Sequence, residues 1–251
     1  MDATGASIDP GEIEKFSKIA DEWWDPFGKF KPLHKFNPAR LAYIRDAATS
    51  HFGRDRRART PLERLRLLDV GCGGGLVAEP MRRLGADVVA IDAAERNVKT
   101  AIVHARTQNL DIDYRVGSVE DLIAAKEAPF DIVLNLEVVE HVADPGAFLA
   151  RSASLVKPGG LMIVATINRT LKAFALAKIG AEYVLGWLPK GTHDPAKFQK
   201  PEEIERALTA AGLTPVARAG VTYNPLMDLW RVAEETDVNY MVTAVNGARA
   251  S

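Results

Sequence analysis

Short apolar runs alternate along the chain with segments whose apolar residues recur at helical spacing. Strands are indicated at residues 65–70, 88–92, 112–116, 130–136 and 161–166. Helices are indicated between them, at residues 77–83, 94–108 and 145–156. The run at 130–136 is almost continuously apolar, which is typical of a parallel strand buried on both faces. This alternation predicts an α/β fold with a doubly wound, mostly parallel sheet.

The C-terminal part of the chain extends this core. It contains an indicated helix at 201–212 and indicated strands at 214–219 and 238–245, which close a sheet of seven strands. We therefore expect a single domain over residues 1–251. Its parts are a helical cap in residues 1–50 and an α/β core in 51–251, with an insertion at about 168–200 after the fifth strand.

Aromatic residues are concentrated between two predicted N-terminal helices. Asp9-Pro10 and Asn37-Pro38 are each typical of a helix start. The loop expected between these helices contains Trp24, Phe27, Phe30 and Phe36. These side chains either form a lid over an apolar ligand or pin the cap to the core, and the sequence leaves both alternatives open.

Four of the five residues after the first strand, 71–75, are glycines. Strand, glycine turn and helix form the start of a βαβ unit. Glycine permits positive φ angles and close approach of the backbone to a ligand, and the next helix begins with free N–H groups. The dinucleotide fingerprint is matched only in part, because Gly71 and Gly73 fit but Leu76 stands at the third glycine position. A turn that needs glycine only for tight packing is the alternative.

Acidic residues mark the ends of the first two strands. Asp69 stands two residues before the first glycine, where a carboxylate fits poorly beside a pyrophosphate but suits a positively charged ligand. An amino group near a sulfonium is such a ligand. Asp92 ends the second strand, where nucleoside-binding folds hold a ribose hydroxyl. Since the carboxyl ends of parallel strands meet at one edge, we expect a nucleoside site there.

Composition narrows the class of protein. The chain has 251 residues and a net charge of −1, so no overall field attracts nucleic acid, and we expect none as a partner. The single cysteine, Cys72, excludes an internal disulfide and fits a reducing compartment. We expect no secretory signal, because the first residues are acidic and lack an apolar core, and no transmembrane helix.

Residues with metal-binding or acid–base chemistry follow the fourth strand. Glu137, Glu140 and His141 have the spacing i, i+3, i+4, so they share a face if a helical turn begins there. Two carboxylates and an imidazole suit a divalent cation such as magnesium, manganese or zinc. Alternatively, Glu140 and His141 bond to each other and cap a turn. A third alternative is that His141 is a general base, because an ordinary imidazole pKa of roughly 6.5 suits deprotonation of a phenol.

Several motifs together resemble one family. Residues 137–142, Glu-Val-Val-Glu-His-Val, look like the segment after strand four in the ubiquinone biosynthesis O-methyltransferase family. Further motifs similar to that family lie at residues 30–34, 37–41, 69–75, 166–170, 180–183, 188–194, 223–225 and 237–241. The likeness therefore covers nearly the whole chain. Residues 227–232 match the family pattern only loosely.

The resemblance implies a fold, an activity and a set of site residues. The implied fold is the Rossmann-like class I methyltransferase fold, and the implied reaction moves a methyl group from S-adenosylmethionine to a phenolic oxygen. The substrates would be a polyprenylated hydroxyphenol and demethylubiquinol. By motif match, the cofactor contacts are Arg40 (methionine carboxylate), Gly71, Asp92 (ribose) and Leu136 (adenosyl pocket), joined by Asp69 and Gly73 of the same loop. The implied ligands of a divalent cation, magnesium first, are Glu137, Glu140 and His141, and His141 is also the candidate catalytic residue.

The implied substrate bears on location. A polyprenyl chain resides in the bilayer, so we expect a cytoplasmic protein attached peripherally to the inner face of the cytoplasmic membrane. Residues 171–188 are amphipathic, with basic residues and the interfacial aromatic Trp187, and they are the candidate contact with anionic lipid. An ordinary core-packing helix is the alternative. Association with other enzymes of quinone biosynthesis is a further expectation.

Two other classes of protein are alternatives to an active methyltransferase. A nicotinamide-dependent oxidoreductase uses a similar sheet, but Leu76 and Asp69 disfavour it. A methyltransferase-like binding module without activity is disfavoured by the intact set of acids.

Overall fold

The computed structural model describes residues 13–14, 22–28, 30–170, 173, 197–224 and 226–247. The helix expected to begin near Asp9 and the amphipathic segment expected at 171–188 lie almost entirely outside these residues. Among the described helices, none is both long and apolar enough to cross a bilayer.

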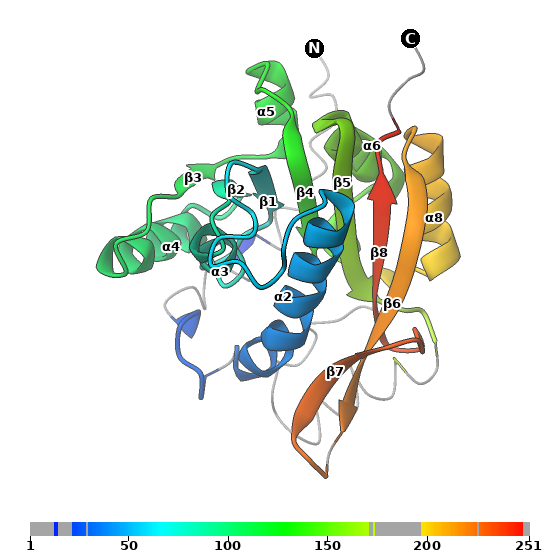
Figure 1. Cartoon of the computed structure of the whole chain (residues 1–251), viewed down its shortest axis with the longest axis horizontal. Coiled ribbons are helices and arrows are strands. Elements are labelled where there is room, and N and C mark those ends of the chain that lie inside the picture. Colours follow the sequence, from blue (N-terminus) through cyan, green and yellow to red (C-terminus); the bar gives the residue numbers. More distant parts are fainter. Residues whose placement is uncertain are drawn as a thin grey trace.

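One mixed sheet forms the centre of the molecule (Figure 1). Its strands are β1 (Arg66–Val70), β2 (Asp87–Asp92), β3 (Asp113–Val116), β4 (Phe130–Leu136), β5 (Val156–Ile167), β6 (Thr214–Asn224), β7 (Leu229–Ala233) and β8 (Asn239–Val245). Within the described residues their order is β3-β2-β1-β4-β5-β8-β6-β7. The first five strands pair in parallel, and β8 is antiparallel to both β5 and β6. The doubly wound, mostly parallel α/β fold is thereby confirmed.

The described sheet has one strand more than the seven expected. The additional strand is β7, which pairs antiparallel with the second half of β6 and forms a hairpin with it. The hairpin projects past the ends of the neighbouring strands (Figure 1). It lies where the family pattern is matched only loosely, and β7 has few buried positions. A strand of this kind lacks the apolar run that identifies the central strands.

Helices cover both faces of the sheet. They are α2 (Lys31–His51), α3 (Ala78–Arg83), α4 (Glu95–Thr107), α5 (Val119–Ala124), α6 (Pro145–Ser154) and α8 (Pro201–Ala210), with a short 3₁₀ helix, η2 (Val139–His141), after β4. α2 and α3 pack on one face, α5, α6 and α8 on the other, and α4 runs along β2 and β3.

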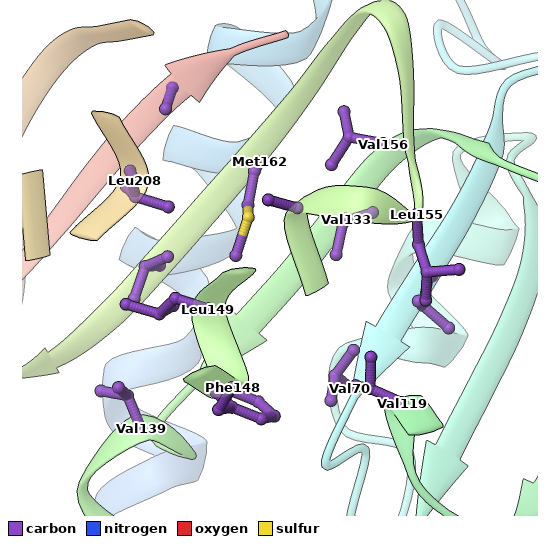
Figure 2. Close-up of a cluster of buried hydrophobic side chains, with 14 of the residues drawn as sticks. Val70, Val119, Val133, Val139, Phe148, Leu149, Leu155, Val156, Met162 and Leu208 are labelled. Carbon is purple, nitrogen blue, oxygen red and sulfur yellow. The ribbon is translucent and has the colours of Figure 1, made fainter. Parts of the chain in front are cut away.

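Successive strand residues supply the two halves of the hydrophobic core. Leu68 and Val70 face α5 and α6, whereas Leu67, which precedes them, faces α2 and α3. Figure 2 shows the first half, in which Val70 and Val133 of the sheet meet Phe148 and Leu149 of α6. This alternation is the ordinary consequence of the two-residue period of a strand. It explains why most positions of β1, of β4 and of the second part of β5 are apolar.

Helix α2 begins earlier than the sequence suggested. Its first residue is Lys31, so the expected loop from 24 to 36 is partly helical and Pro38 lies inside the helix. Asn37 does not cap a helix start. Its side chain is buried and donates to the carbonyl of Leu76, which ties α2 to the loop after β1. This tertiary contact replaces the local capping that the dipeptide usually indicates.

The strand order reverses beside β1, which pairs with β2 on one side and β4 on the other. Ligands of open α/β sheets bind at such a switch point, outside the carboxyl ends of the strands. Asp92 ends β2, the glycine loop follows β1, and Glu137 follows β4. The topology thus brings these three segments to one edge.

We predict that Gly220→Ala destabilises the fold through the β6–β7 hairpin. A Cβ atom at this buried position would lie 1.6 Å from the backbone carbonyl oxygen of Glu235, so the backbone must move. We expect the free energy of unfolding to fall by about 1–3 kcal/mol, as for other overpacked sites. Urea unfolding would measure it. The matched control is Gly247→Ala, where no atom lies within 4 Å; equal stability of the two variants would contradict the predicted clash.

Candidate functional site

A cavity of about 270 Å³ opens at the strand edge described above. All the site residues proposed from the sequence line it: Arg40, Asp69, Gly71, Gly73, Asp92, Leu136, Glu137, Glu140 and His141. They come from α2, the end of β1 and the loop after it, the end of β2, the end of β4 and the segment that follows β4, including η2. Residues up to 101 positions apart in the sequence therefore share one cavity.

The glycine loop passes close to the segment after β4. Gly71 has a φ of 72°, and its N–H and that of Cys72 both donate to the carbonyl of Ile91 in β2. A Cβ atom at Gly71 would lie 2.4 Å from Cγ2 of Val138. Both the backbone conformation and the lack of space require glycine here. At Gly71 the tight turn therefore lines the cavity with backbone alone.

Asp69 is a buried carboxylate with an unsatisfied oxygen. Its exposed fraction is 2%, and its Oδ2 has no hydrogen-bond partner among the described residues. Burial raises the pKa of Asp69 to about 7; the nearby Asp92 raises it further, and Arg40 opposes both. A positively charged donor entering the cavity would supply the missing partner.

Asp92 is held by three donors at the end of β2. Its Oδ2 accepts from the N–H of Gly73 (2.9 Å), and its Oδ1 from the N–H of Ala94 (2.8 Å) and Nδ2 of Asn97 (3.2 Å). Burial raises the pKa of Asp92, and these hydrogen bonds lower it. The Gly73 contact fixes the carboxylate against the glycine loop, on the side that lines the cavity.

Arg40 reaches the cavity from the middle of α2. Both its Nε and its Nη2 donate to Oδ1 of Asn37, at 3.1 and 2.7 Å. Its Nη1 has no hydrogen-bond partner among the described residues and lies 3.7 Å from Oε1 of Glu137. Burial lowers the pKa of Arg40, while the carboxylates of Glu137, Asp69 and Glu140 raise it. The guanidinium therefore presents an open donor to the cavity.

Two glutamates form an acidic pair beside Arg40. Glu137 has the left-handed φ of 58°, a strained conformation of the kind that clusters at functional sites. Burial raises the pKa of Glu137 to about 8, and the carboxylate of Glu140 raises it further. Glu140 is buried and accepts at Oε2 from the hydroxyl of Thr166, at 2.8 Å. Divalent cations such as magnesium bind carboxylate oxygens, and a bound cation would supply positive charge beside these two carboxylates.

The expected helical face of Glu137, Glu140 and His141 does not form. Only Val139–His141 is helical, as the 3₁₀ helix η2, and Glu137 precedes it in the left-handed conformation. Among the described residues, no group of three or more His, Cys, Asp or Glu side chains converges closely enough to hold a metal ion. The two carboxylates fit a cation in their chemistry, and His141 lines the same cavity without completing a three-ligand set.

The N-terminal aromatics pack on the glycine loop. A Cβ atom at Gly74 would lie 2.4 Å from the Cβ of Trp23, and Nε1 of Trp24 donates to the carbonyl of Gly74 at 2.8 Å. Trp23 and Phe30 stack with ring centroids 3.8 Å apart. These contacts pin the segment to the core, and Trp23 and Phe30 also line the cavity, so the described residues are compatible with both alternatives.

Four residues that hold the site together were not anticipated from the sequence: Trp23, Asn37, Asn97 and Thr166. Asn37 stands three residues before Arg40, a spacing that places two side chains on one helix face, so it could have been found. Asn97, in the first turn of α4, stands five residues after Asp92 in the sequence, so it could also have been found. The contacts of Trp23 and Thr166 span 74 and 26 residues and leave no local signal.

Comparison with known proteins relates this chain to methyltransferases. A family model described as a methyltransferase domain matches residues 40–218. A ubiquinone biosynthesis O-methyltransferase of Parvibaculum lavamentivorans is 60% identical over 96% of this chain and 95% of its own. One of Maricaulis maris is 62% identical over 95% of this chain and 93% of its own.

Two solved structures share the fold at low identity. Magnesium protoporphyrin IX methyltransferase of Synechocystis PCC 6803, with bound SAH (S-adenosylhomocysteine), has a TM-score of 0.64 at 18% identity and covers 95% of both chains. An S-adenosylmethionine-dependent methyltransferase of Clostridium acetobutylicum has a TM-score of 0.61 at 14% identity and covers 93% of this chain and 98% of its own. At such identities the likeness extends to the fold alone.

We predict that Asp69 makes stability depend on pH. Its pKa is about 7 in the folded chain against an ordinary value of 3.8, so the folded state binds the proton more tightly. The free energy of unfolding should therefore fall as pH rises from about 4 to about 7, with no further loss from this group above that. Asp69→Asn should remove about 2 kcal/mol of the fall between about pH 5 and pH 7. Urea unfolding at several pH values would measure it, and parallel profiles of the two proteins would contradict the assignment.

Proposed function

The chain belongs to the ubiquinone biosynthesis O-methyltransferase family, and from this premise we propose how its cavity performs the reaction. The protein is an S-adenosylmethionine-dependent O-methyltransferase of ubiquinone biosynthesis. This membership excludes the nicotinamide-dependent oxidoreductase considered from the sequence. The observation that carries the proposal is the convergence of two unsatisfied groups, Asp69 and Arg40, with an acidic pair in one cavity.

We propose that the cofactor lies along the edge from Arg40 to Leu136. The open Nη1 of Arg40 would donate to the methionine carboxylate, and the unpaired Oδ2 of Asp69 would accept from the methionine amino group. Asp92 would accept from a ribose hydroxyl, and Leu136 would line the adenosyl pocket. Gly71 and Gly73 would let the ligand approach the backbone closely. The amino group and the carboxylate on the α-carbon of the cofactor carry opposite charges, so contacts with Asp69 and Arg40 would give that end of the cofactor one orientation.

The acidic pair is the proposed site of a divalent cation, with magnesium first and manganese or zinc as alternatives. Support comes from Oε1 of Glu137, which is buried and has no hydrogen-bond partner among the described residues although it lies 3.7 Å from Nη1 of Arg40, and from the raised pKa of that carboxyl beside Glu140. When bound, a divalent cation supplies a Lewis acid that lowers the pKa of a phenol. Thr166 would keep Glu140 in its position through the hydroxyl hydrogen bond.

His141 is the proposed proton acceptor. A phenol is a weak nucleophile and its phenolate a strong one, so a base at the phenolic oxygen promotes attack on the sulfonium methyl carbon. His141 lines the cavity next to Glu140, but it does not converge with both carboxylates. We propose the role of base for it, and the experiment below tests whether it is a metal ligand instead or as well. Alignment of oxygen, carbon and sulfur by the cavity walls would supply several kcal/mol.

The proposed substrates are a polyprenylated hydroxyphenol and demethylubiquinol. The cavity has apolar walls, including Leu33, Leu76 and Phe148, which suit an aromatic ring and the first part of a prenyl chain. The proposed location is cytoplasmic, with peripheral attachment to the inner face of the cytoplasmic membrane. Association with other enzymes of quinone biosynthesis stays a prediction.

We predict that methyl transfer requires a divalent cation held by the acidic pair. Turnover of a short-chain demethylubiquinol should vanish with a chelator and return with magnesium, manganese or zinc. Glu137→Gln removes a buried repulsion, so the metal-free variant should be at least as stable as wild type. It should bind Mn²⁺ at least about tenfold more weakly, a loss of ~1.4 kcal/mol. Calorimetry and the Mn²⁺-induced rise in melting temperature measure this without turnover.

His141→Asn separates the two roles of His141 in the same assays. If His141 is the base, the variant loses turnover but keeps the Mn²⁺-induced rise in melting temperature. If His141 is a ligand, it loses both. Full activity of thoroughly chelated wild-type enzyme would overturn the cation proposal.

We predict weak, reversible attachment to anionic membranes through the amphipathic segment at residues 171–188. Co-sedimentation with anionic vesicles should exceed that with neutral ones and fall with salt, because surface charge is screened over roughly 10 Å at 0.1 M. The double variant Phe174→Asp with Trp187→Asp should lose the attachment, since it breaks the apolar face of the segment. Equal partitioning to both lipids, or retained binding by the double variant, would count against this role.

A further inference from the structure

A chain of hydrogen bonds leads from the N-terminal segment to Asp92. Nε1 of Trp23 donates to Oδ1 of Asn97 at 3.0 Å, and Nδ2 of Asn97 donates to Oδ1 of Asp92 at 3.2 Å. Trp23 and Asn97 are both buried, with exposed fractions of 8% and 2%. We propose that Trp23 and Asn97 are positioning residues for the cofactor ribose, because they orient the Asp92 carboxylate and leave its Oδ2 to accept from a ribose hydroxyl. The inference rests on the role of Asp92 under the proposed function.

The donors and acceptors of Trp23, Asn97 and Asp92 allow these hydrogen bonds to run in only one direction. An indole N–H can only donate, so the amide oxygen of Asn97 must face Trp23. The amide nitrogen of Asn97 must then face Asp92, and it can only donate to the carboxylate there. Trp23 thereby selects the orientation of Asn97 that favours ionised Asp92. With the amide reversed, the Asn97 oxygen would face a carboxylate oxygen and repel it.

The donors on Asp92 decide where a ligand can bind. A carboxylate offers about four acceptor positions, two on each oxygen. Within the described residues, Oδ1 receives two donors, from Ala94 and Asn97, and Oδ2 receives one, from Gly73. The position left over is therefore on Oδ2, the oxygen that is already bonded to the glycine loop. A ribose hydroxyl that donates there lies next to the loop that the cofactor approaches.

The packing of Trp23 keeps this arrangement rigid. Its indole stacks on Phe30 and lies over Gly73, where a Cβ atom would come within 2.5 Å of the ring. Trp24 contacts the same loop through a different group, because its Nε1 donates to the carbonyl of Gly74. Its ring stacks on that of His104, with centroids 3.5 Å apart. Both tryptophans pack on the glycine loop, but their N–H groups have different partners: within the described contacts, only the Trp23 N–H is linked to Asp92.

This difference supplies a matched pair of variants. Trp23→Phe keeps an aromatic ring over the loop and removes the N–H that orients Asn97. Trp24→Phe removes an N–H bonded to Gly74 and leaves the Asn97–Asp92 bond in place. Asn97→Ala removes the middle of the chain of bonds and serves as a second test if Trp23→Phe folds poorly. Thermal unfolding would verify that each variant is folded.

The experiment measures binding of SAH and of its 2′-deoxy and 3′-deoxy analogues by calorimetry. Wild type should bind at least one deoxy analogue more weakly than SAH. Trp23→Phe and Asn97→Ala should weaken SAH binding about 2- to 10-fold, the range of one ordinary hydrogen bond, and hardly change the binding of that analogue. The ratio of the two affinities should therefore fall in both variants and persist in Trp24→Phe.

The outcomes separate the inference from its premise. If wild type does not distinguish SAH from either analogue, Asp92 does not hold the ribose, and both the premise and the inference fail. If wild type distinguishes them and Trp23→Phe and Asn97→Ala keep the full ratio, the positioning role alone is overturned. An equal fall of the ratio in Trp24→Phe would also overturn it, because the tryptophans would then act only as anchors of the loop.

Discussion

Parallel pairing of β1 with both β2 and β4 is the constraint on which the site depends. Because three strand ends meet at one edge, the segments that follow them must share a small volume. The loop after β1 fits into that volume only as glycine, since a Cβ atom at Gly71 would strike Val138 and one at Gly74 would strike Trp23. At its glycines this loop therefore lines the cavity with backbone, which a ligand can approach closely.

The electrostatics of the cavity are unbalanced without ligands. Four carboxylates line it, those of Asp69, Asp92, Glu137 and Glu140, and Arg40 faces three of them. Burial raises the pKa of Asp69 to about 7 and that of Glu137 to about 8, because the charged form of each carboxyl loses solvation in the cavity. A buried, unpaired charge lowers the stability of a fold. The sulfonium and amino group of a cofactor, and a divalent cation, would each reduce that strain, so stability and binding are coupled in this fold.

The N-terminal segment is part of the site, because it positions site residues as well as covering them. Through Asn37 it fixes Arg40, and through Trp23 it reaches Asn97 and the Asp92 carboxylate. The same segment closes one wall of the cavity with Phe30 and Leu33. A family model that begins at residue 40 leaves out Trp23 and Asn37, although the geometry of two site residues depends on them.

The sequence by itself determined the layout of the sheet and most of the cavity. Apolar runs located β1, β2, β4 and β5, because strands buried on both faces must be apolar at nearly every position. The acids at strand ends were predictable, since topology alone places them together. Only the tertiary structure decided what depends on contacts between distant residues: the bond of Trp23 to Asn97, the bond of Thr166 to Glu140 and the early start of α2. It also decided that a left-handed Glu137 followed by a 3₁₀ turn replaces the expected helical face. The physical reason is that spacing along a chain fixes which side chains meet only where the backbone is regular, and the site lies where it is not.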